Sequence, residues 1–200
     1  DSSIYGTFSI RVVAQDVAGN NSIPLLFRNC QYSNLTNDDF LDLISQRTFK
    51  YFLDWVTKDD YLILDKSDSP DCISIAAIGF GLSALCVGEK RGWINAGEAQ
   101  MRIEAILKKL YDSPQGTAST GVSGYKGFFY HFLTPDGLRK DACELSSIDT
   151  AILMMGVLTA KEYFNTNENI GSLTDNLCNR VEWDWMLDNS NNLFHMEWKP

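Results

Sequence analysis

Two carboxylates that could do chemistry, Glu144 and Asp149, stand close together in the segment Asp141–Thr150, which has the sequence Asp-Ala-Cys-Glu-Leu-Ser-Ser-Ile-Asp-Thr. Glu144 and Asp149 have the chemistry of a general acid, a general base or a clamp for substrate hydroxyl groups. Asp149 also fits a structural role, because Ser146 and Asp149 have the spacing of a capping box at a helix start. Both interpretations of Asp149 stay open, whereas Glu144 precedes the cap and has no such structural explanation.

An aromatic segment, Tyr125–Leu133, precedes these acids and is followed by the turn sequence Thr134–Gly137. The pattern predicts a β-hairpin over residues 125–139 with aromatic side chains on both faces. One face would line a cleft where sugar rings stack, or both faces would pack against protein. His131 and His195 are the only histidines, and neither has a further ligand at metal spacing, so we expect no metal and no cofactor.

The helices expected to position these residues alternate in character. Amphipathic helices are predicted from Thr36 to Thr57, from Asn95 to Tyr111 and around Ile170–Val181. Helices apolar almost all round, and therefore expected to be buried, are predicted over 73–87 and 146–164, the first opened by Ser69-Pro70-Asp71. This order, outer then inner, is what a double ring of helices requires.

Three long segments lead into, or lie between, these helices: Lys58–Cys72, Ser113–Ser147 and Asp188–Pro200. In a double ring, the segments that enter inner helices all emerge on the same rim. Loops of this length usually carry function. The sequence therefore predicts the active site at this rim. Within it, Asp71 has a structural explanation as a first-turn acid of the inner helix.

The first residues have a different pattern. Residues 4–14 alternate in hydropathy, and the turn Asp16–Asn21 separates them from a short strand expected at Ser22–Phe27. This resembles the last hairpin of a fibronectin-type-III or immunoglobulin-like sandwich. We therefore expect the C-terminal strands of a sandwich module at 1–28, a linker at 29–37 and a helical domain at 38–200.

Composition narrows the function classes. The 200 residues include 26 acidic and 17 basic side chains, a net charge of -9, which disfavours nucleic acid. The uncharged stretch Cys72–Gly88 is too short to span a membrane. No export leader opens the sequence, so any such signal has been removed or was never included. The five cysteines suggest neither a zinc site nor a disulfide framework, and we expect them to be buried thiols.

Several segments together resemble the bacterial glucoamylase-like (glycoamylase) family, which includes endo-β-1,2-glucanases. They are TFKYFLDW from Thr48, SPDCISIAAIGFGLSAL from Ser69, GFFYHFLTPDGLR from Gly127, ELSSIDTAILMMGVLTAKEYF from Glu144, VEWDWML from Val181 and MEWKP at the end. The resemblance covers about residues 38–200. It departs from the family pattern at Glu197, where a small residue is usual, and at the acid that commonly follows the WKP motif.

The resemblance implies an (α/α)6 barrel, of which this chain supplies the N-terminal part, and an exported glycoside hydrolase that acts on a glucan, located in the periplasm or at the cell surface. It also implies that Glu144 and Asp149 are catalytic, with substrate contacts from Asp71, Tyr130, His131, Trp198 and Lys199. An inverting mechanism is favoured, Glu144 being the protonated acid with a raised pKa and Asp149 the ionised group.

The resemblance implies two kinds of partner: an oligo- or polysaccharide substrate, and either the remainder of the chain or an adjacent domain. Without that remainder or domain, we expect the inner helices to be uncovered on one side. The competing class is a non-catalytic glycan-binding or scaffold module of an exported polysaccharide-utilisation protein. A lyase or a phosphorylase on the same barrel is a third alternative.

Overall fold

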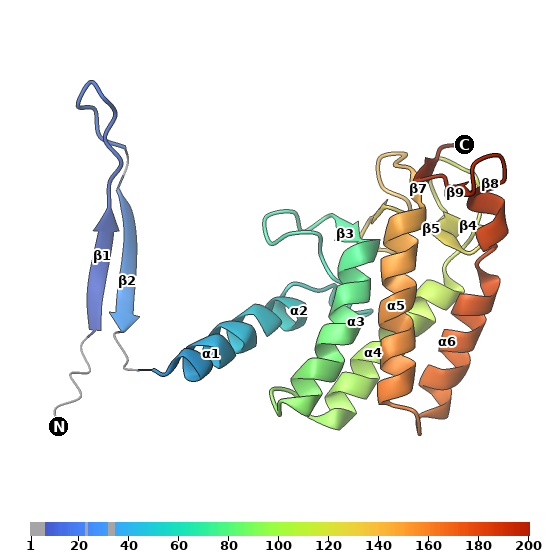
Figure 1. Cartoon of the computed structure of the whole chain (residues 1–200), viewed down its shortest axis with the longest axis horizontal. Coiled ribbons are helices and arrows are strands. Elements are labelled where there is room, and N and C mark those ends of the chain that lie inside the picture. The colour runs from blue at the N-terminus through green and yellow to red at the C-terminus, as the bar shows by residue number, and fades with distance from the viewer. Residues whose placement is uncertain (1–6, 23, 32–34) are drawn as a thin grey trace. The chain divides into compact units, whose positions relative to one another are not determined.

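The structure, a computed structural model, describes residues 7–22, 24–31 and 35–200. The chain divides into two compact units, residues 1–45 and 46–200 (Figure 1). The division falls within helix α1 (Asn37–Phe49). The larger unit is mainly helical and contains all the candidate site residues.

The smaller unit contains an antiparallel pair, β1 (Thr7–Val12) and β2 (Leu25–Gln31). The connecting turn is organised by Asp16, whose carboxylate accepts hydrogen bonds from the backbone N–H and the side-chain amide of Asn20, both at 2.9 Å. Gly19 supplies the positive φ of 86° that the turn requires. The predicted hairpin is therefore present, with its turn at the expected residues.

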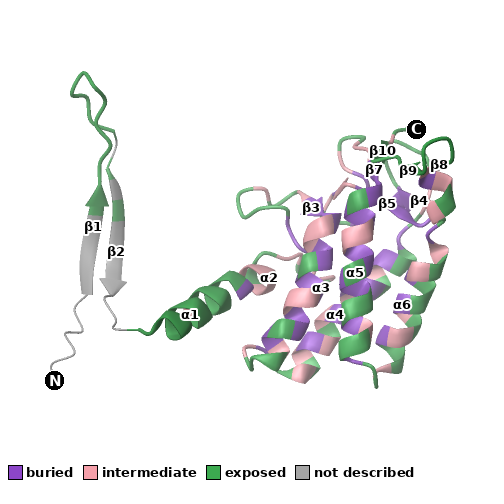
Figure 2. Ribbon diagram, viewed as in Figure 1, coloured by how far each residue is buried: buried purple, intermediate pink, exposed green. Residues whose placement is uncertain are grey.

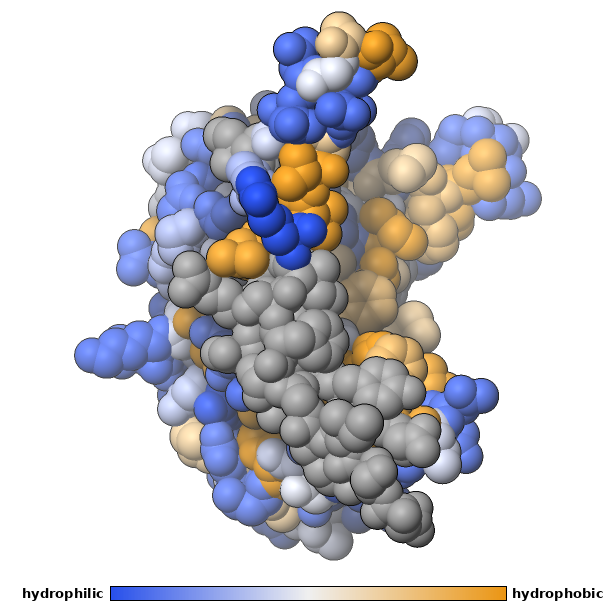
Figure 3. All heavy atoms as spheres, turned by 90° about the vertical axis from the view of Figure 1, so that its left-hand side faces the viewer, coloured by the Kyte–Doolittle hydropathy of each residue, from blue (hydrophilic) through white to orange (hydrophobic). Residues whose placement is uncertain are grey.

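The strand boundaries differ from those expected. Residues 4–6 of the first predicted strand lie outside the described residues, and β2 continues to Gln31, into the segment predicted to be a linker. Val17 at the turn is fully exposed. Figure 3 shows other hydrophobic residues at the surface among the hydrophilic ones. A sandwich module at 1–28 remains a prediction.

The first predicted helix begins as expected but ends early. Thr36 and Asp39 form the capping box: the Thr36 hydroxyl donates to the Asp39 carboxylate at 2.7 Å, and the Asp39 N–H donates to Thr36 Oγ1 at 3.2 Å. The helix is divided into α1 and the short α2 (Tyr51–Asp54). It stops before Thr57 because the Thr57 N–H donates to the carbonyl of Leu62 instead of continuing the helical pattern.

Four longer helices form the body of the larger unit. They are α3 (Ile75–Lys90), α4 (Ala96–Asp112), α5 (Ser147–Tyr163) and α6 (Glu168–Arg180). Helix α3 packs against α5, and α4 packs against α6 (Figure 1). Each begins at a residue whose side chain accepts a backbone N–H of the first turn, these N-caps being Ser74, Asn95, Ser146 and Asn167.

Helices α3 and α5 approach so closely that their backbones touch. A Cβ atom on Gly156 would lie 2.1 Å from the Gly79 carbonyl oxygen, and one on Gly79 would lie 2.4 Å from the carbonyl oxygen of Ile152. No side chain fits there. Gly79 and Gly156 therefore let the two helices pack backbone against backbone.

These two helices are buried except along one side of each, which is the uncovered side expected when only this part of the barrel is present. Phe80 and Val87 on α3 are 59% and 53% exposed, and Met155 and Leu158 on α5 are 69% and 46% exposed (Figure 2). No element of the described chain covers this stripe. By contrast, α4 and α6 are amphipathic as predicted, with the apolar side buried through Ala99, Ile103, Ile106, Leu107 and Leu110 on α4 and Ile170, Thr174 and Leu177 on α6.

Helix α3 starts later than predicted. The residues Ser69-Pro70-Asp71 form a turn, in which the Cys72 N–H donates to the Ser69 carbonyl at 3.2 Å. They are followed by β3 (Ile73–Ser74), which is extended because it pairs with β6 (Phe132–Leu133). The helix can therefore begin only at Ile75, so Asp71 is not a first-turn acid.

Short strands gather at the end of the body where α3 and α5 begin (Figure 1). One sheet has the order β10-β7-β5-β4, formed by β4 (Gly124–Tyr125), β5 (Phe128–Tyr130), β7 (Leu145–Ser146) and β10 (Glu197–Trp198). The C-terminal region also contains the 3-10 helix η1 (Trp183–Met186) and the pair β8 (Leu187–Asp188) and β9 (Leu193–Phe194). Because the Lys140 ammonium donates to the Asp71 carboxylate at 2.9 Å and β10 pairs with β7, the three segments predicted to share a rim are joined by hydrogen bonds.

The aromatic hairpin is tighter than predicted. Strands β4 and β5 are joined by Lys126 and Gly127, which have φ angles of 52° and 82°. The turn at Thr134–Gly137 also forms, with the Thr134 N–H donating to the Leu138 carbonyl at 2.7 Å. However, β6 leaves the first hairpin to pair with β3. The segment is thus divided between two sheets.

Candidate active site

Glu144 directly precedes strand β7, which lies between β10 and β5 in the sheet. In the register of the sheet, Leu145 lies opposite Tyr130 on one side and Trp198 on the other. One residue further along, the register brings His131, Glu144 and Lys199 next to one another, and the His131 N–H donates to the Glu144 carbonyl at 2.9 Å. Segments distant in the sequence therefore converge at this row.

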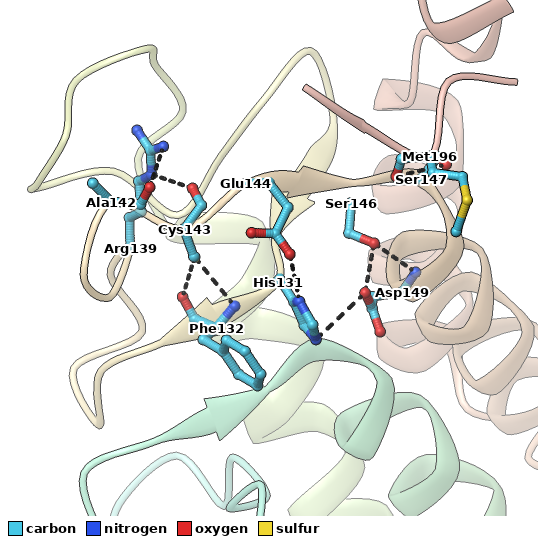
Figure 4. A network of polar contacts seen from close by, with 10 residues as sticks. All are labelled: His131, Phe132, Arg139, Ala142, Cys143, Glu144, Ser146, Ser147, Asp149 and Met196. Carbon is cyan, nitrogen blue, oxygen red and sulfur yellow. Dashed lines mark hydrogen bonds and ion pairs between the residues drawn. The ribbon is translucent and has the colours of Figure 1, made fainter. Parts of the chain in front are cut away.

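His131 lies between the two predicted catalytic carboxylates (Figure 4). Its Nδ1 is 2.7 Å from Glu144 Oε1, and its Nε2 is 3.7 Å from Asp149 Oδ2. The side chains are 30%, 22% and 13% exposed for His131, Glu144 and Asp149 respectively. The structure thus brings together three of the residues singled out from the sequence, in a group that is partly accessible.

The electrostatics of Glu144 differ from the expectation. Burial acts to raise the pKa of Glu144, but the hydrogen bond from His131 and the nearby charge of Lys199 outweigh it, so that the pKa lies below its ordinary value. Glu144 is therefore held ionised. The expectation that Glu144 is a protonated acid with a raised pKa is wrong for this structure, because the hydrogen-bond partner stabilises the charged form.

Asp149 has the structural role that the sequence left open. Its backbone N–H donates to Ser146 Oγ at 3.1 Å, and the Ser146 hydroxyl donates to the Asp149 carboxylate. This is the capping box at the start of α5. The same carboxylate oxygen faces His131, so Asp149 both caps the helix and lines the site.

A buried arginine supports the loop before Glu144. Arg139 is 5% exposed, and its guanidinium donates to the carbonyls of Cys143 at 2.8 Å, Ala142 at 3.1 Å and Ala118 at 3.1 Å (Figure 4). Ala142 has a φ of 51°, a strained conformation that these bonds hold in place. Arg139 is a positioning residue that the sequence reasoning missed. Its place next to a turn gave no signal of burial.

The C-terminal segment is attached to the start of α5. The Ser147 hydroxyl donates to the His195 carbonyl at 2.7 Å, and the Ser147 N–H donates to the Met196 carbonyl at 3.2 Å. This brings Trp198 into a cluster with Tyr125, on which it stacks with ring centroids 5.6 Å apart, and with Trp185, 5.1 Å away. All three rings are partly exposed. The sequence indicated Trp198, whereas Trp185 was missed.

Of the predicted substrate contacts, Tyr130 needs correction and Asp71 stays a prediction. Tyr130 has no exposed surface; its hydroxyl donates to the Gly116 carbonyl at 3.0 Å, and Arg139 lies over its ring at 4.0 Å. It packs beneath the site and cannot stack on a sugar. The Asp71 side chain is 70% exposed and pairs with Lys140 at 2.9 Å. That ion pair joins Asp71 to the loop preceding Cys143 rather than to the His131 group.

The thiols and the remaining features have simpler outcomes. Cys86 is buried, while Cys72, Cys143 and Cys178 are partly buried free thiols, and the side chain of Cys30 lies outside the described residues. Burial is thus correct only for Cys86. Over the described ranges, no group of three or more His, Cys, Asp or Glu is arranged to hold a metal ion. None of the described helices is both long and apolar enough to cross a membrane.

Comparisons with known proteins place this fold. No family model matches the chain. It is 28% identical over 201 aligned residues to an exo-β-1,2-glucooligosaccharide sophorohydrolase (non-reducing end) of Parabacteroides distasonis, in a match that covers 95% of this chain and 27% of the relative. The chain therefore spans about a quarter of the length of that relative.

Several solved structures of known proteins are similar in fold to this chain. A glucoamylase candidate from Bacteroides uniformis matches with a TM-score of 0.72 and 22% identity, over 84% of this chain and 42% of that one. The β-1,2-glucanase of Parabacteroides distasonis matches with a TM-score of 0.69 and 24% identity, over 96% and 28%. The endo-β-1,2-glucanase of Chitinophaga pinensis, in complex with sophorotriose and glucose, matches with a TM-score of 0.69 and 21% identity, over 83% and 41%. The chain has the fold of these glucoamylase-like structures, and the resemblance stated from the sequence motifs is confirmed.

Proposed function

We propose that this chain is part of a glycoside hydrolase that acts on β-1,2-glucan, built on an (α/α)6 barrel and exported to the periplasm or the cell surface. The observation that carries the proposal is the pair of carboxylates, Glu144 and Asp149, that face one histidine at the accessible end of α5. The names of the relatives, which are hydrolases of β-1,2-linked glucans, support the choice of substrate.

The arrangement suits hydrolysis. Glycosidases use two carboxyl groups, about 5 to 5.5 Å apart when the anomeric configuration is retained and about 6.5 to 9.5 Å apart when it is inverted. Glu144, held ionised by His131, suits a hydrogen-bond acceptor that orients its partner in the site rather than a proton donor. An inverting mechanism is part of the proposal.

The aromatic cluster supplies the binding surface in this proposal. The partly exposed rings of Tyr125, Trp185 and Trp198 stand on or beside the strands next to Glu144, and sugar rings stack on such faces. Lys199 follows directly and contributes positive charge near Glu144. Trp198 and Lys199 thus keep the substrate-binding role expected from the sequence.

The test is the release of glucooligosaccharides from β-1,2-glucan by the protein at its natural length, with β-1,3-glucan and starch as comparison substrates. We expect Glu144→Gln and Asp149→Asn each to lower kcat at least about 100-fold, the usual scale of general acid-base assistance. Glu168→Gln, which changes a first-turn acid of α6, is the matched control and should leave kcat unchanged.

Retention of the polymer in affinity electrophoresis without any release would contradict hydrolysis and favour the glycan-binding alternative. Products that carry an unsaturated sugar or a sugar phosphate would instead identify a lyase or a phosphorylase. Full activity of Asp149→Asn with a lowered melting temperature would restrict Asp149 to its capping role.

A further inference from the structure

Contacts to one ring nitrogen, to one ring face and to the backbone hold His131 in place. Nδ1 is in contact with Glu144 at 2.7 Å, and one face stacks on Phe132 with ring centroids 3.8 Å apart. The backbone is held too, since its N–H donates to Glu144 and its carbonyl accepts from the Ile75 N–H at 3.3 Å. Nε2 is the ring atom without a hydrogen bond among the described residues.

The proton on the ring follows from Glu144. An ionised carboxylate only accepts hydrogen bonds, so the nitrogen that contacts it at 2.7 Å carries the hydrogen. The lowered pKa of Glu144 agrees with this assignment. In the neutral imidazole, the other nitrogen, Nε2, then has a free lone pair.

Asp149 does not use that lone pair. Its Oδ2 is 3.7 Å from Nε2, beyond hydrogen-bond distance, and the same oxygen already accepts the hydroxyl of Ser146. The charged groups near the ring are therefore Glu144 at Nδ1, Asp149 beside Nε2, and Lys199 next to Glu144 in the sheet register. A proton that arrived on Nε2 would be stabilised by the Asp149 carboxylate.

We propose that Glu144 and His131 form a carboxylate-imidazole pair in which Glu144 positions the ring and Nε2 of His131 accepts a proton from a hydroxyl group bound in the site. This rests on the proposed function, because the hydroxyl is that of the attacking water. As the water oxygen bonds to the anomeric carbon, its O–H bond breaks and the proton bonds to Nε2, while the glycosidic C–O bond breaks and the leaving sugar oxygen takes a proton from solvent water. The resulting imidazolium lies between two carboxylates. Glu144 is then a positioning residue and His131 the group that contacts the hydroxyl.

Nitrogen NMR of the imidazole rings tests the pair without requiring activity. The chain has two histidines, so His195→Asn leaves only the signals of His131. At a pH where the ring is neutral, we expect the Nδ1–H form to exceed the Nε2–H form at least about tenfold. Glu144→Gln should reduce this ratio at least about fivefold, because the amide can donate as well as accept.

Asp149→Asn is the matched control and should not lower the ratio, since Asp149 makes no hydrogen bond to the ring and its charge beside Nε2 can only favour the Nε2–H form. A dominant Nε2–H form in the unmodified protein, or a ratio unaffected by Glu144→Gln, would overturn the pair. His131→Asn keeps a donor near the position of Nδ1 and removes the acceptor. It should lower kcat at least about 100-fold with a much smaller change in KM.

Sophorotriose, at a saturating concentration, distinguishes this inference from the proposed function. It should move the Nε2 resonance of His131 and leave His195 unchanged. No movement at Nε2 in a protein that cleaves β-1,2-glucan would overturn proton acceptance by His131 while the hydrolase stands. The expected tautomer and Nε2 response in a protein that releases no product would support the pair and contradict hydrolysis.

Discussion

The two helix pairs of the larger unit, α3 with α5 and α4 with α6, begin with the same kind of N-cap but differ in their relation to the site. Ser74 and Ser146 cap α3 and α5, and Asn95 and Asn167 cap α4 and α6, each through a side-chain oxygen that accepts a first-turn N–H. Only the serine caps lie in strands, β3 and β7, and of these only the α5 cap, Ser146, donates to a carboxylate beside His131. Local helix chemistry is therefore shared, and the preceding segment decides where the site forms.

The packing of the pairs also differs. Helices α3 and α5 touch through glycine backbones and expose an apolar stripe, whereas α4 and α6 bury one apolar side and present polar residues outside. A surface cavity of about 810 Å³ lies between α4 and α6, lined in part by Gln100, Glu104 and Lys108, and it contains none of the site residues. A cavity alone thus does not mark the chemistry in this fold.

The largest effect is expected where the inner pair touches. Gly156→Ala places a methyl group 2.1 Å from the Gly79 carbonyl oxygen, so the helices must separate. We expect a loss of about 1 to 3 kcal/mol, as for other overpacked contacts. Gly171→Ala on α6 meets nothing within 4 Å and should stabilise the protein by about 0.5 to 1 kcal/mol. Thermal unfolding measures both, and equal effects would remove the distinction between the pairs.

An intermediate effect is expected at the caps. Ser146→Ala and Asn95→Ala each remove one capping acceptor, so each should cost about 1 kcal/mol, or about 2 to 4 °C in Tm. Only Ser146→Ala also removes the hydroxyl that donates to Asp149. We therefore expect activity on β-1,2-glucan to fall at least about tenfold in that variant alone. Equal activity losses in both would show that the caps act through stability.

The smallest effect concerns pH. Because the folded pKa of Glu144 lies below 4.5, its ordinary value, ionised Glu144 contributes stability above pH 4.5 that is lost as the pH falls through the lowered pKa. Calorimetry from neutral pH to below 4.5 should therefore show a shallower acid limb for Glu144→Gln. In a His131→Asn background the same change should have a smaller effect, since the histidine contact is gone. An identical difference in both backgrounds would show that His131 does not lower the pKa.

The sequence predicted the helices well where periodicity or caps were strong. The starts at Asn37, Ala96 and Ser147 agree with the expected capping signals to within a residue or two. The predicted start of α3, Ile73, is two residues early, because Ser69-Pro70-Asp71 has the local chemistry of a helix start and only pairing with β6 keeps Ile73 extended. Local patterns cannot show that long-range pairing.

The sequence predicted which residues form the site but not the direction in which the pKa of Glu144 is shifted. Motifs indicated Glu144, Asp149, His131 and Trp198, and the structure groups the first three around one ring. The lowered pKa of Glu144 could not be predicted, because it depends on His131 and Lys199, which reach Glu144 through strand register. Tyr130 was assigned to the wrong environment because alternation on a two-residue scale does not show which face is covered.

The central position of β7 has a consequence for the order of folding. Its neighbours come from Phe129–Tyr130 on one side and Glu197–Trp198 on the other, and the Ser147 hydroxyl bonds to a carbonyl 48 residues later in the chain. Contacts of such sequence separation close late, because the loop entropy is lost before the contact is gained. During synthesis, the helices can assemble first, and His131, Glu144 and Lys199 come together only when β10 pairs with β7. The candidate active site is thus completed after the helices that support it.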